Sequence, residues 1–134
     1  MFQLAPGCFV YLDDVKYISQ LETTGVITVH LGNETVTIPP APGDLASATL
    51  RYAQMLDAIE AYLQEYRHRR FARYDNRLIN ERLCNGVWVK PTEIGNYRVV
   101  LSFAKLNPIE IGQGDQETCI TCAEGIRAAL VTSR

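Results

Sequence analysis

The chain has 134 residues, a formal net charge of −2 and a hydrophobic content of 47%. This length suits a single domain with its own core, and the slight acidity argues against a general affinity for nucleic acid. The segment Met1–Pro6 has neither the basic start nor the apolar run of a secretory signal, and no stretch approaches the roughly 18 apolar residues of a membrane span. We therefore expect a cytoplasmic protein that does not enter a membrane and keeps its four cysteines reduced.

Strand patterns dominate the first forty residues. The glycine-asparagine pair at 32–33 is a tight-turn signal, so a hairpin should form around it. Alternation along this hairpin places Ile27 and Val29 on an apolar face that must pack against another element, with Thr28 and His30 on the opposite face. The expected strands cover residues 8–11, 15–21, 26–31 and 34–39.

A helical pattern follows the proline-rich segment 39–43. Asp44 is a suitable N-cap, so the helix should begin near Leu45. The pattern weakens after Arg67 and then resumes until Asn85-Gly86, which predicts a second helix or a kinked continuation of the first. The apolar stripe is wide enough to serve a core on one flank and a partner helix on the other. Its members are Leu45, Ala48, Thr49, Tyr52, Met55, Leu56, Ile59, Tyr62, Leu63 and Tyr66.

A second β unit and a short closing helix complete the chain. The expected strands cover residues 87–90, 95–106, 109–111 and 118–120, and the closing helix runs from Cys122 to Val131. The predicted fold is therefore α+β, with two small antiparallel β units flanking a long, kinked central helix pair. We expect one domain, made of a β unit over 1–40, a helical middle over 44–84 and a second β unit with its short helix over 86–134.

Two stretches of the chain resemble each other. The segment Gly7–Val15 matches Gly86–Ile94 in its order of glycine, aromatic, valine, acid and branched aliphatic residues. This similarity predicts a structural pseudo-repeat, although short aromatic-valine strands are common enough for it to be coincidence. A pseudo-repeat favours binding and assembly over a single asymmetric catalytic centre.

The basic residues are unevenly distributed. Six of the thirteen lie between positions 67 and 82, where only Asp75 and Glu81 oppose them. On the expected helix Arg70, Arg73 and Arg77 share one face, beside a face of aromatic and aliphatic residues, which is the combination that a nucleotide site needs. The alternative is a solvated helical face whose arginines pair with acids of the preceding helix, namely Asp57, Glu60 or Glu65.

Other motifs support binding rather than catalysis. Trp88 is the only tryptophan, and it is either a stacking platform or a core anchor. The pair Cys119 and Cys122 lacks the further ligands of a zinc site, so we expect no metal. His30 and His68 are the only histidines, and no phosphate-binding glycine loop or nucleophile elbow is present. We expect no enzyme activity and no cofactor.

The layout of a β unit, a long helix with a basic continuation and a second β unit resembles the phage-encoded Thoeris anti-defence proteins. The segments that carry the resemblance are Phe9–Val15, Tyr74–Asn80 and Asn85–Pro91. The resemblance implies a homo-oligomeric sponge that binds a cyclic ADP-ribose isomer, without catalysis, and withholds it from a bacterial immune effector. It also implies stacking and polar contacts from Trp88, Asn96 and Arg127, with Arg70, Arg73 and Arg77 as phosphate ligands.

Two other classes of function fit the same sequence. One is a protein-binding inhibitor or adaptor of phage or plasmid origin that docks through its long helix and loses its partner when Tyr52 or Tyr62 is made charged. The other is a small nucleic-acid-binding regulator, which predicts binding that weakens steeply as salt rises. We rank nucleic acid below a small cyclic nucleotide because the chain as a whole is acidic.

Overall fold

The computed structural model describes residues 1–39, 43–66 and 71–132. Two helices, α1 (Leu45–Tyr66) and α2 (Gln116–Thr132), accompany ten strands and one short 3-10 helix (Leu12–Asp14). The strands are β1 (Phe2–Ala5), β2 (Cys8–Val10), β3 (Val15–Ile18), β4 (Ile27–Leu31), β5 (Glu34–Ile38), β6 (Phe71–Tyr74), β7 (Arg77–Asn80), β8 (Cys84–Glu93), β9 (Asn96–Phe103) and β10 (Leu106–Gly114).

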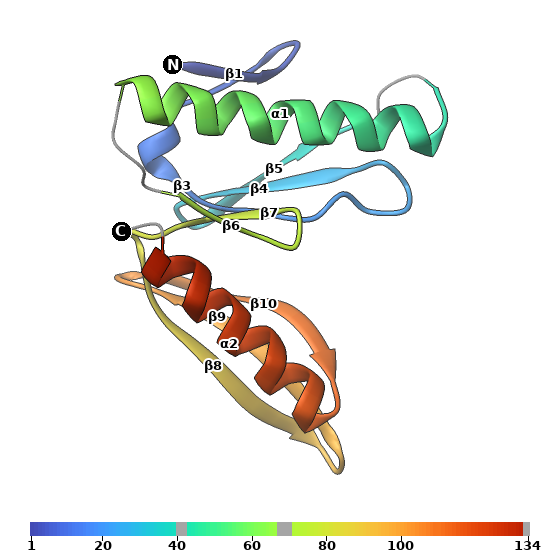
Figure 1. Ribbon diagram of the computed structural model, residues 1–134, viewed down its shortest axis with the longest axis vertical. Coiled ribbons are helices and arrows are strands. Elements are labelled where there is room, and N and C mark those ends of the chain that lie inside the picture. The colour runs from blue at the N-terminus through green and yellow to red at the C-terminus, as the bar shows by residue number, and fades with distance from the viewer. Residues whose placement is uncertain (40–42, 67–70, 133–134) are drawn as a thin grey trace.

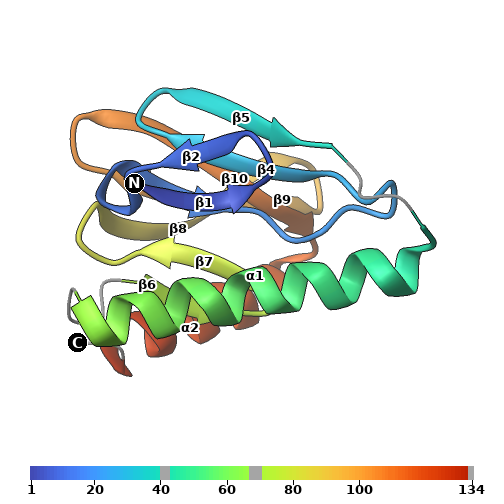
Figure 2. The same ribbon diagram turned by 90° about the horizontal axis from the view of Figure 1, so that it is seen from above.

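The strands form three antiparallel sheets. The largest has the order β5-β4-β3-β7-β6, the second has the order β10-β9-β8, and β1 and β2 form a separate hairpin. We call the first the central sheet and the second the lower sheet. In Figure 1, α1 and the β1-β2 hairpin lie on one side of the central sheet, while the lower sheet and α2 lie on the other. Figure 2 shows the same arrangement from above, with α1 running along one edge.

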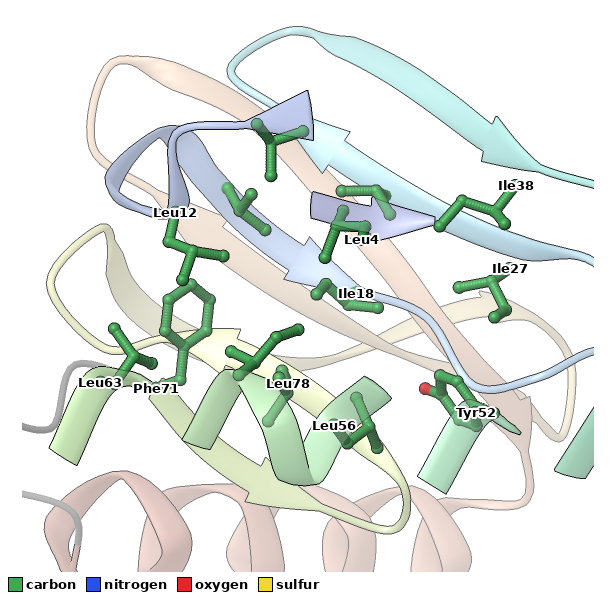
Figure 3. Packing of buried hydrophobic residues seen from close by; sticks show 14 residues of the cluster. Leu4, Leu12, Ile18, Ile27, Ile38, Tyr52, Leu56, Leu63, Phe71 and Leu78 are labelled. Carbon is green, nitrogen blue, oxygen red and sulfur yellow. The ribbon is translucent and has the colours of Figure 1, made fainter. Parts of the chain in front are cut away.

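The helix α1 begins where the sequence predicts, because Asp44 caps it. The Asp44 carboxylate accepts a hydrogen bond of 2.9 Å from the backbone amide of Ser47. Apolar residues then recur every three or four positions, and Leu56, Ile59 and Leu63 are buried against the central sheet. Figure 3 shows Leu56, Leu63, Phe71 and Leu78 within this cluster. Each buried aliphatic side chain contributes about 1.5–3 kcal/mol of stabilisation, so this face supplies a large share of the folding energy.

The predicted hairpin around Gly32 is confirmed. The strands β4 and β5 pair from Ile27 with Ile38 to Leu31 with Glu34, and Gly32 adopts the positive φ of 54° that this two-residue turn requires. Its apolar face, which includes Ile27 and Val29, packs into the core beneath α1.

The predicted central helix pair is wrong, because the chain is mostly β and residues 71–80 form a hairpin. Strands β6 and β7 pair from Phe71 with Asn80 to Tyr74 with Arg77. The two residues between them, Asp75 and Asn76, have φ values of 48° and 55°, which are typical of a type I′ turn. Aspartate and asparagine tolerate this conformation better than most residues, so a local turn ends any helix here. The residues 81–84 that complete the predicted helical middle form a turn and the start of β8.

The predicted closing elements need a smaller correction. Residues 118–120 are helical, because α2 starts at Gln116 and includes the expected helix from Cys122 to Val131. The carboxylate of Asp115 accepts a hydrogen bond of 2.7 Å from the amide of Thr118, which caps the helix six residues before the expected start at Cys122.

The pseudo-repeat appears in the order of elements and not in the two matched segments. A hairpin, three strands and a helix occur in that order twice, ending in α1 and then in α2. The segment Gly7–Val15 spans β2, the 3-10 helix and the start of β3, whereas Gly86–Glu93 lies within the single strand β8. The two matched segments therefore differ in conformation.

Candidate functional site

A hollow of about 750 Å³ lies between the central sheet and strand β10 of the lower sheet. Its walls come from three strands of the central sheet, from the loop after β3 and from β10. Its lining residues are Tyr17, Ser19, Gln20, Leu21, Glu22, Thr23, Thr28, His30, Arg77, Ile109, Glu110 and Ile111. We call it the Arg77 hollow.

Arg77 reaches the hollow because it is the first residue after the Asp75-Asn76 turn. Side chains alternate along β7, so Leu78 packs in the core beneath α1 while Arg77 and Ile79 face the opposite way. Only 6% of Arg77 is exposed, and its Nε atom has no hydrogen-bond partner in the described part of the chain. A buried polar group without a partner costs free energy, so the burial of Arg77 is not explained by a contribution to stability.

The turn that carries Arg77 is held in place by its neighbours. The Gln20 side-chain amide donates a hydrogen bond of 2.6 Å to the carbonyl oxygen of Asp75. The Tyr52 hydroxyl, from α1, contacts the carbonyl oxygens of both Ser19 and Asn76. The loop after β3 and the β6-β7 turn are thus tied together, which fixes the position of Arg77.

The floor of the hollow contains an aromatic pair. The rings of Tyr17 and His30 have centroids 5.6 Å apart, on the adjacent strands β3 and β4. Burial raises the pKa of Tyr17 to about 12, although Arg77 opposes this shift, so the phenol stays protonated and can donate a hydrogen bond. Burial and the charge of Lys16 lower the pKa of His30 below 6.5, so this imidazole is neutral at pH 7.

A second buried cation lies near His30. Lys16 is 3% exposed, donates a hydrogen bond of 2.9 Å to the carbonyl oxygen of Asn107, and lies over the ring of Phe103. Burial lowers the pKa of its ammonium group. The side of the central sheet that faces the lower sheet therefore contains two buried basic residues, Lys16 and Arg77.

Two exposed acidic residues, Glu22 and Glu110, also line the hollow. Glu110 accepts a hydrogen bond of 2.9 Å from the side-chain amide of Gln113. The hollow therefore combines a buried guanidinium with carboxylates that can accept hydroxyl hydrogens. That combination suits a ligand with both an anionic group and sugar hydroxyls.

The structure separates Arg73 from Arg77, two of the three arginines that the helical interpretation placed on one face. Arg73 points toward α1, where its guanidinium lies 2.8 Å from the Asp57 carboxylate and 3.4 Å from that of Glu60. The pairing with acids of the preceding helix is therefore present for Arg73, although Arg73 lies on strand β6 and not on the helical face of that alternative. Arg77 faces the other side of the sheet because strand side chains alternate. Arg70 lies outside the described residues.

The other predicted site residues also lie apart from the hollow. Trp88 is on β8, at the far edge of the lower sheet from β10, and is 54% exposed, so the core-anchor alternative is wrong. Asn96 begins β9, next to the turn from β8. Arg127, on α2, borders a different hollow of about 360 Å³ together with Gly86. None of the three lines the Arg77 hollow.

The residues that accompany Arg77 were not predicted as site residues. Tyr17, Ser19, Thr28, His30 and Glu110 come from segments far from Arg77 in the sequence. One signal was available, because Thr28 and His30 form the polar face of a strand whose other face is apolar. A polar strand face is equally typical of solvent exposure, so the pattern alone does not identify a site.

The two tyrosines of the docking-helix interpretation belong to the interior. Tyr52 is buried, and Tyr62 packs against Phe2 with ring centroids 5.3 Å apart. A charge at either position would disturb the fold, so its effect on a partner could not be interpreted as a contact. The helix stripe therefore serves the chain's own core at these positions.

Metal and membrane sites have little support in the described residues. Within 1–39, 43–66 and 71–132, no group of three or more His, Cys, Asp or Glu side chains is arranged to hold a metal ion. Burial raises the pKa of the Cys119 and Cys84 thiols, which disfavours the thiolate form that binds metals. Neither described helix is long and apolar enough to cross a bilayer.

Comparison with known proteins adds no assignment. No protein-family model, curated protein or solved structure matches the chain. The chemistry of the site must therefore carry the functional argument.

Proposed function

We propose that the protein binds and sequesters a small phosphorylated nucleotide in the Arg77 hollow, and that a cyclic ADP-ribose isomer is the ligand. The observation that carries this proposal is the buried Arg77, whose Nε atom has no partner in the described chain and which borders a hollow of about 750 Å³. A phosphate would supply an acceptor for this Nε atom, because a guanidinium can bind phosphate oxygens through two parallel hydrogen bonds.

The size and lining of the hollow support a ligand of this kind. Pockets for small molecules typically measure about 300–1,000 Å³, and this hollow falls in that range. Thr28 and the Tyr17 hydroxyl can bond to polar groups of the ligand, and Glu22 and Glu110 can accept hydrogens from ribose hydroxyls. Because these acids also oppose the charge of Arg77, the hollow favours a nucleotide over a simple inorganic anion.

Binding without conversion is the simplest chemistry for these residues. Among the described residues, no cysteine lines the hollow, and its serine and threonines make no hydrogen bond to His30 of the kind that activates a nucleophile. We propose that the ligand leaves the protein unaltered. Sequestration in the host cytoplasm, to block anti-phage immunity, and homo-oligomerisation are parts of the proposal that follow from the resemblance to Thoeris anti-defence proteins.

Native mass spectrometry and calorimetry test the proposal with cyclic ADP-ribose isomers, ADP-ribose, NAD and cyclic dinucleotides. We expect a cyclic ADP-ribose isomer to bind and to be recovered unchanged after the protein is denatured. Binding of none of these compounds, or recovery of a hydrolysed product, would contradict sequestration.

Two variants with the same change of charge test the position of the site. Arg77→Gln should weaken binding roughly 10- to 100-fold, because a hydrogen bond to a charged group is worth about 1.5–3 kcal/mol. Arg73→Gln is the matched control, since Arg73 pairs with Asp57 and Glu60 on the opposite face of the central sheet. Trp88→Ala should leave this binding unchanged, because Trp88 does not line the hollow. Equal losses in the two arginine variants would place the ligand elsewhere.

A further inference from the structure

The face of the lower sheet that points away from α2 has an unusual composition. Val87, Val89, Val99 and Leu101 point toward α2 and join its core. Alternation therefore places the intervening residues on the opposite face, which we call the outer face. Strand pairing arranges that face in two rows, Lys90-Arg98-Gln113 and Trp88-Val100-Glu110.

Trp88 is an open aromatic surface on this face. More than half of the residue is exposed, although it is the largest side chain in the lower sheet. Gly86 lies two positions earlier on the same face, and a β-carbon there would approach the indole Nε1 to 2.8 Å. The glycine therefore lets the indole lie against the strand while leaving it accessible to a ligand. An exposed indole held in this way can stack on a flat ring.

Two basic residues occupy the next row. Lys90 and Arg98 pair directly across strands β8 and β9, which places like charges on neighbouring positions of one face. Like charges in such a pair are destabilising. The Nε atom of Arg98 is also buried and has no hydrogen-bond partner among the described residues. An anion between these two side chains would relieve the repulsion and supply the missing acceptor.

We propose that the outer face binds a nucleobase and its phosphate within a single-stranded nucleic acid. Trp88 stacks on the base, and Lys90 and Arg98 contact the phosphate. Adjacent rows on one face of a strand are about 7 Å apart, a distance that one nucleotide can span. Trp88 and Lys90 are exposed on this face, so a strand can approach their side chains, whereas Val100 in the row of Trp88 is buried. The three contacting side chains lie on β8 and β9 and do not line the Arg77 hollow, although Glu110, in the row of Trp88, does.

Intrinsic fluorescence tests the proposal directly, because Trp88 is the only tryptophan in the chain. The probes are oligo(dT) and oligo(rU) of about 12 nucleotides, within the range of single-strand site sizes, together with a DNA duplex and uridine monophosphate. We expect both single strands to quench the fluorescence, with an affinity that falls as salt rises. The duplex should quench weakly, because its bases are already stacked.

Anisotropy of a labelled oligonucleotide separates the contributions of individual side chains. Trp88→Ala should weaken binding roughly tenfold, as expected for one lost stacking contact. Arg98→Gln and Lys90→Gln should each weaken it several-fold. Lys105→Gln, at the exposed β9-β10 turn, makes the same change of charge and should have no effect. Thermal unfolding should show that every variant is folded, with Lys90→Gln and Arg98→Gln at least as stable as the wild type because each removes one partner of the like-charge pair.

Several results would overturn the proposal. These are no quenching by any single strand, quenching by uridine monophosphate but not by the oligonucleotides, or equal losses in Arg98→Gln and Lys105→Gln. Arg77→Gln should leave oligonucleotide binding unchanged, so failure at the outer face and failure at the hollow are distinguishable.

Discussion

The two faces of the central sheet differ in the kind of residue that they bury. The face toward α1 buries aliphatic residues such as Val29 and Leu78, which are completely inaccessible to solvent. The face toward the lower sheet contains Lys16, Tyr17, His30 and Arg77, of which three are fully or nearly buried. The first face stabilises the fold through apolar burial. The second face buries polar and charged groups, which contributes less to stability because their desolvation costs free energy.

The buried polar residues of this protein are themselves of two kinds. Asn80 is fully used, since its side-chain amide donates to the Val15 carbonyl at 2.8 Å and its oxygen accepts from the Arg82 amide at 3.0 Å. It holds β7 to β3 and needs no further function. Arg77, on the same strand, has a buried Nε atom with no partner in the described chain. The contrast supports the proposal that Arg77 binds a ligand.

The largest expected effect comes from the apolar face. Leu56→Ala removes a fully buried side chain beneath α1 and should lower the free energy of unfolding by about 2–5 kcal/mol. Urea denaturation measures the loss. Leu50→Ala, on the exposed side of the same helix, is the control and should change stability by less than about 0.5 kcal/mol. Similar values for both variants would mean that α1 does not pack as described.

Gly125 tests the contact between α2 and the central sheet. A β-carbon at this position would lie 2.5 Å from Cε2 of Tyr74 on β6. Gly125→Ala should therefore lower stability by about 1–3 kcal/mol, despite the better helix propensity of alanine. In a Tyr74→Leu background the ring is absent, so the same substitution should instead raise stability by about 1 kcal/mol. A sign that does not reverse would exclude the ring as the cause.

The pH dependence of stability tests the polar face. Because the pKa of His30 is lowered from 6.5 in the folded state, folding favours the neutral imidazole. The associated stability is present above pH 6.5 and is lost as the pH falls through the lower folded-state pKa. Urea denaturation at pH 7.5 and pH 5.5 should show a smaller loss for His30→Gln than for the wild type. Equal losses would show that other groups control this range.

The smallest predicted effects come from the two helix N-caps. One cap is on α1 and the other on α2, so the two substitutions compare helices on opposite sides of the central sheet. Asp44→Ala and Asp115→Ala each remove a carboxylate that accepts an amide hydrogen at the start of α1 and α2. Each substitution should lower the melting temperature slightly, measured by thermal unfolding. The hydrogen bonds lower the pKa of both carboxyl groups, so the contribution is lost in strong acid. A variant as stable as the wild type would show that its cap does not contribute.

Much of the apolar face could be predicted from the sequence, because its signals are local. The Gly32 turn, the alternation around Val29 and the Asp44 cap all act over a few neighbouring residues, and each is present in the structure. The hairpin at 71–80 was missed for an equally local reason. Apolar residues at Phe71, Tyr74 and Leu78 repeat at helical spacing, so the expected helix continues through Asp75 and Asn76, where the structure has a turn.

The candidate site could be predicted only in part. Arg77 was among the predicted phosphate ligands, but the reason was a helical face that does not exist. Its neighbours Tyr17, His30 and Glu110 come from β3, β4 and β10, and strand pairing and sheet packing bring them together. No short-range sequence pattern predicts that these residues lie close together. Trp88 and Arg98 illustrate the same limit, since their proximity depends on the register of β8 and β9.

The most direct test of this account is the stability of Arg77→Met, measured by urea denaturation with and without a cyclic ADP-ribose isomer. Without ligand, the variant should be more stable than the wild type by roughly 1 kcal/mol, because it no longer buries an unpartnered polar group. With ligand, only the wild type should gain stability. A variant that is less stable than the wild type and still gains stability from the ligand would contradict the assignment of Arg77 to the site.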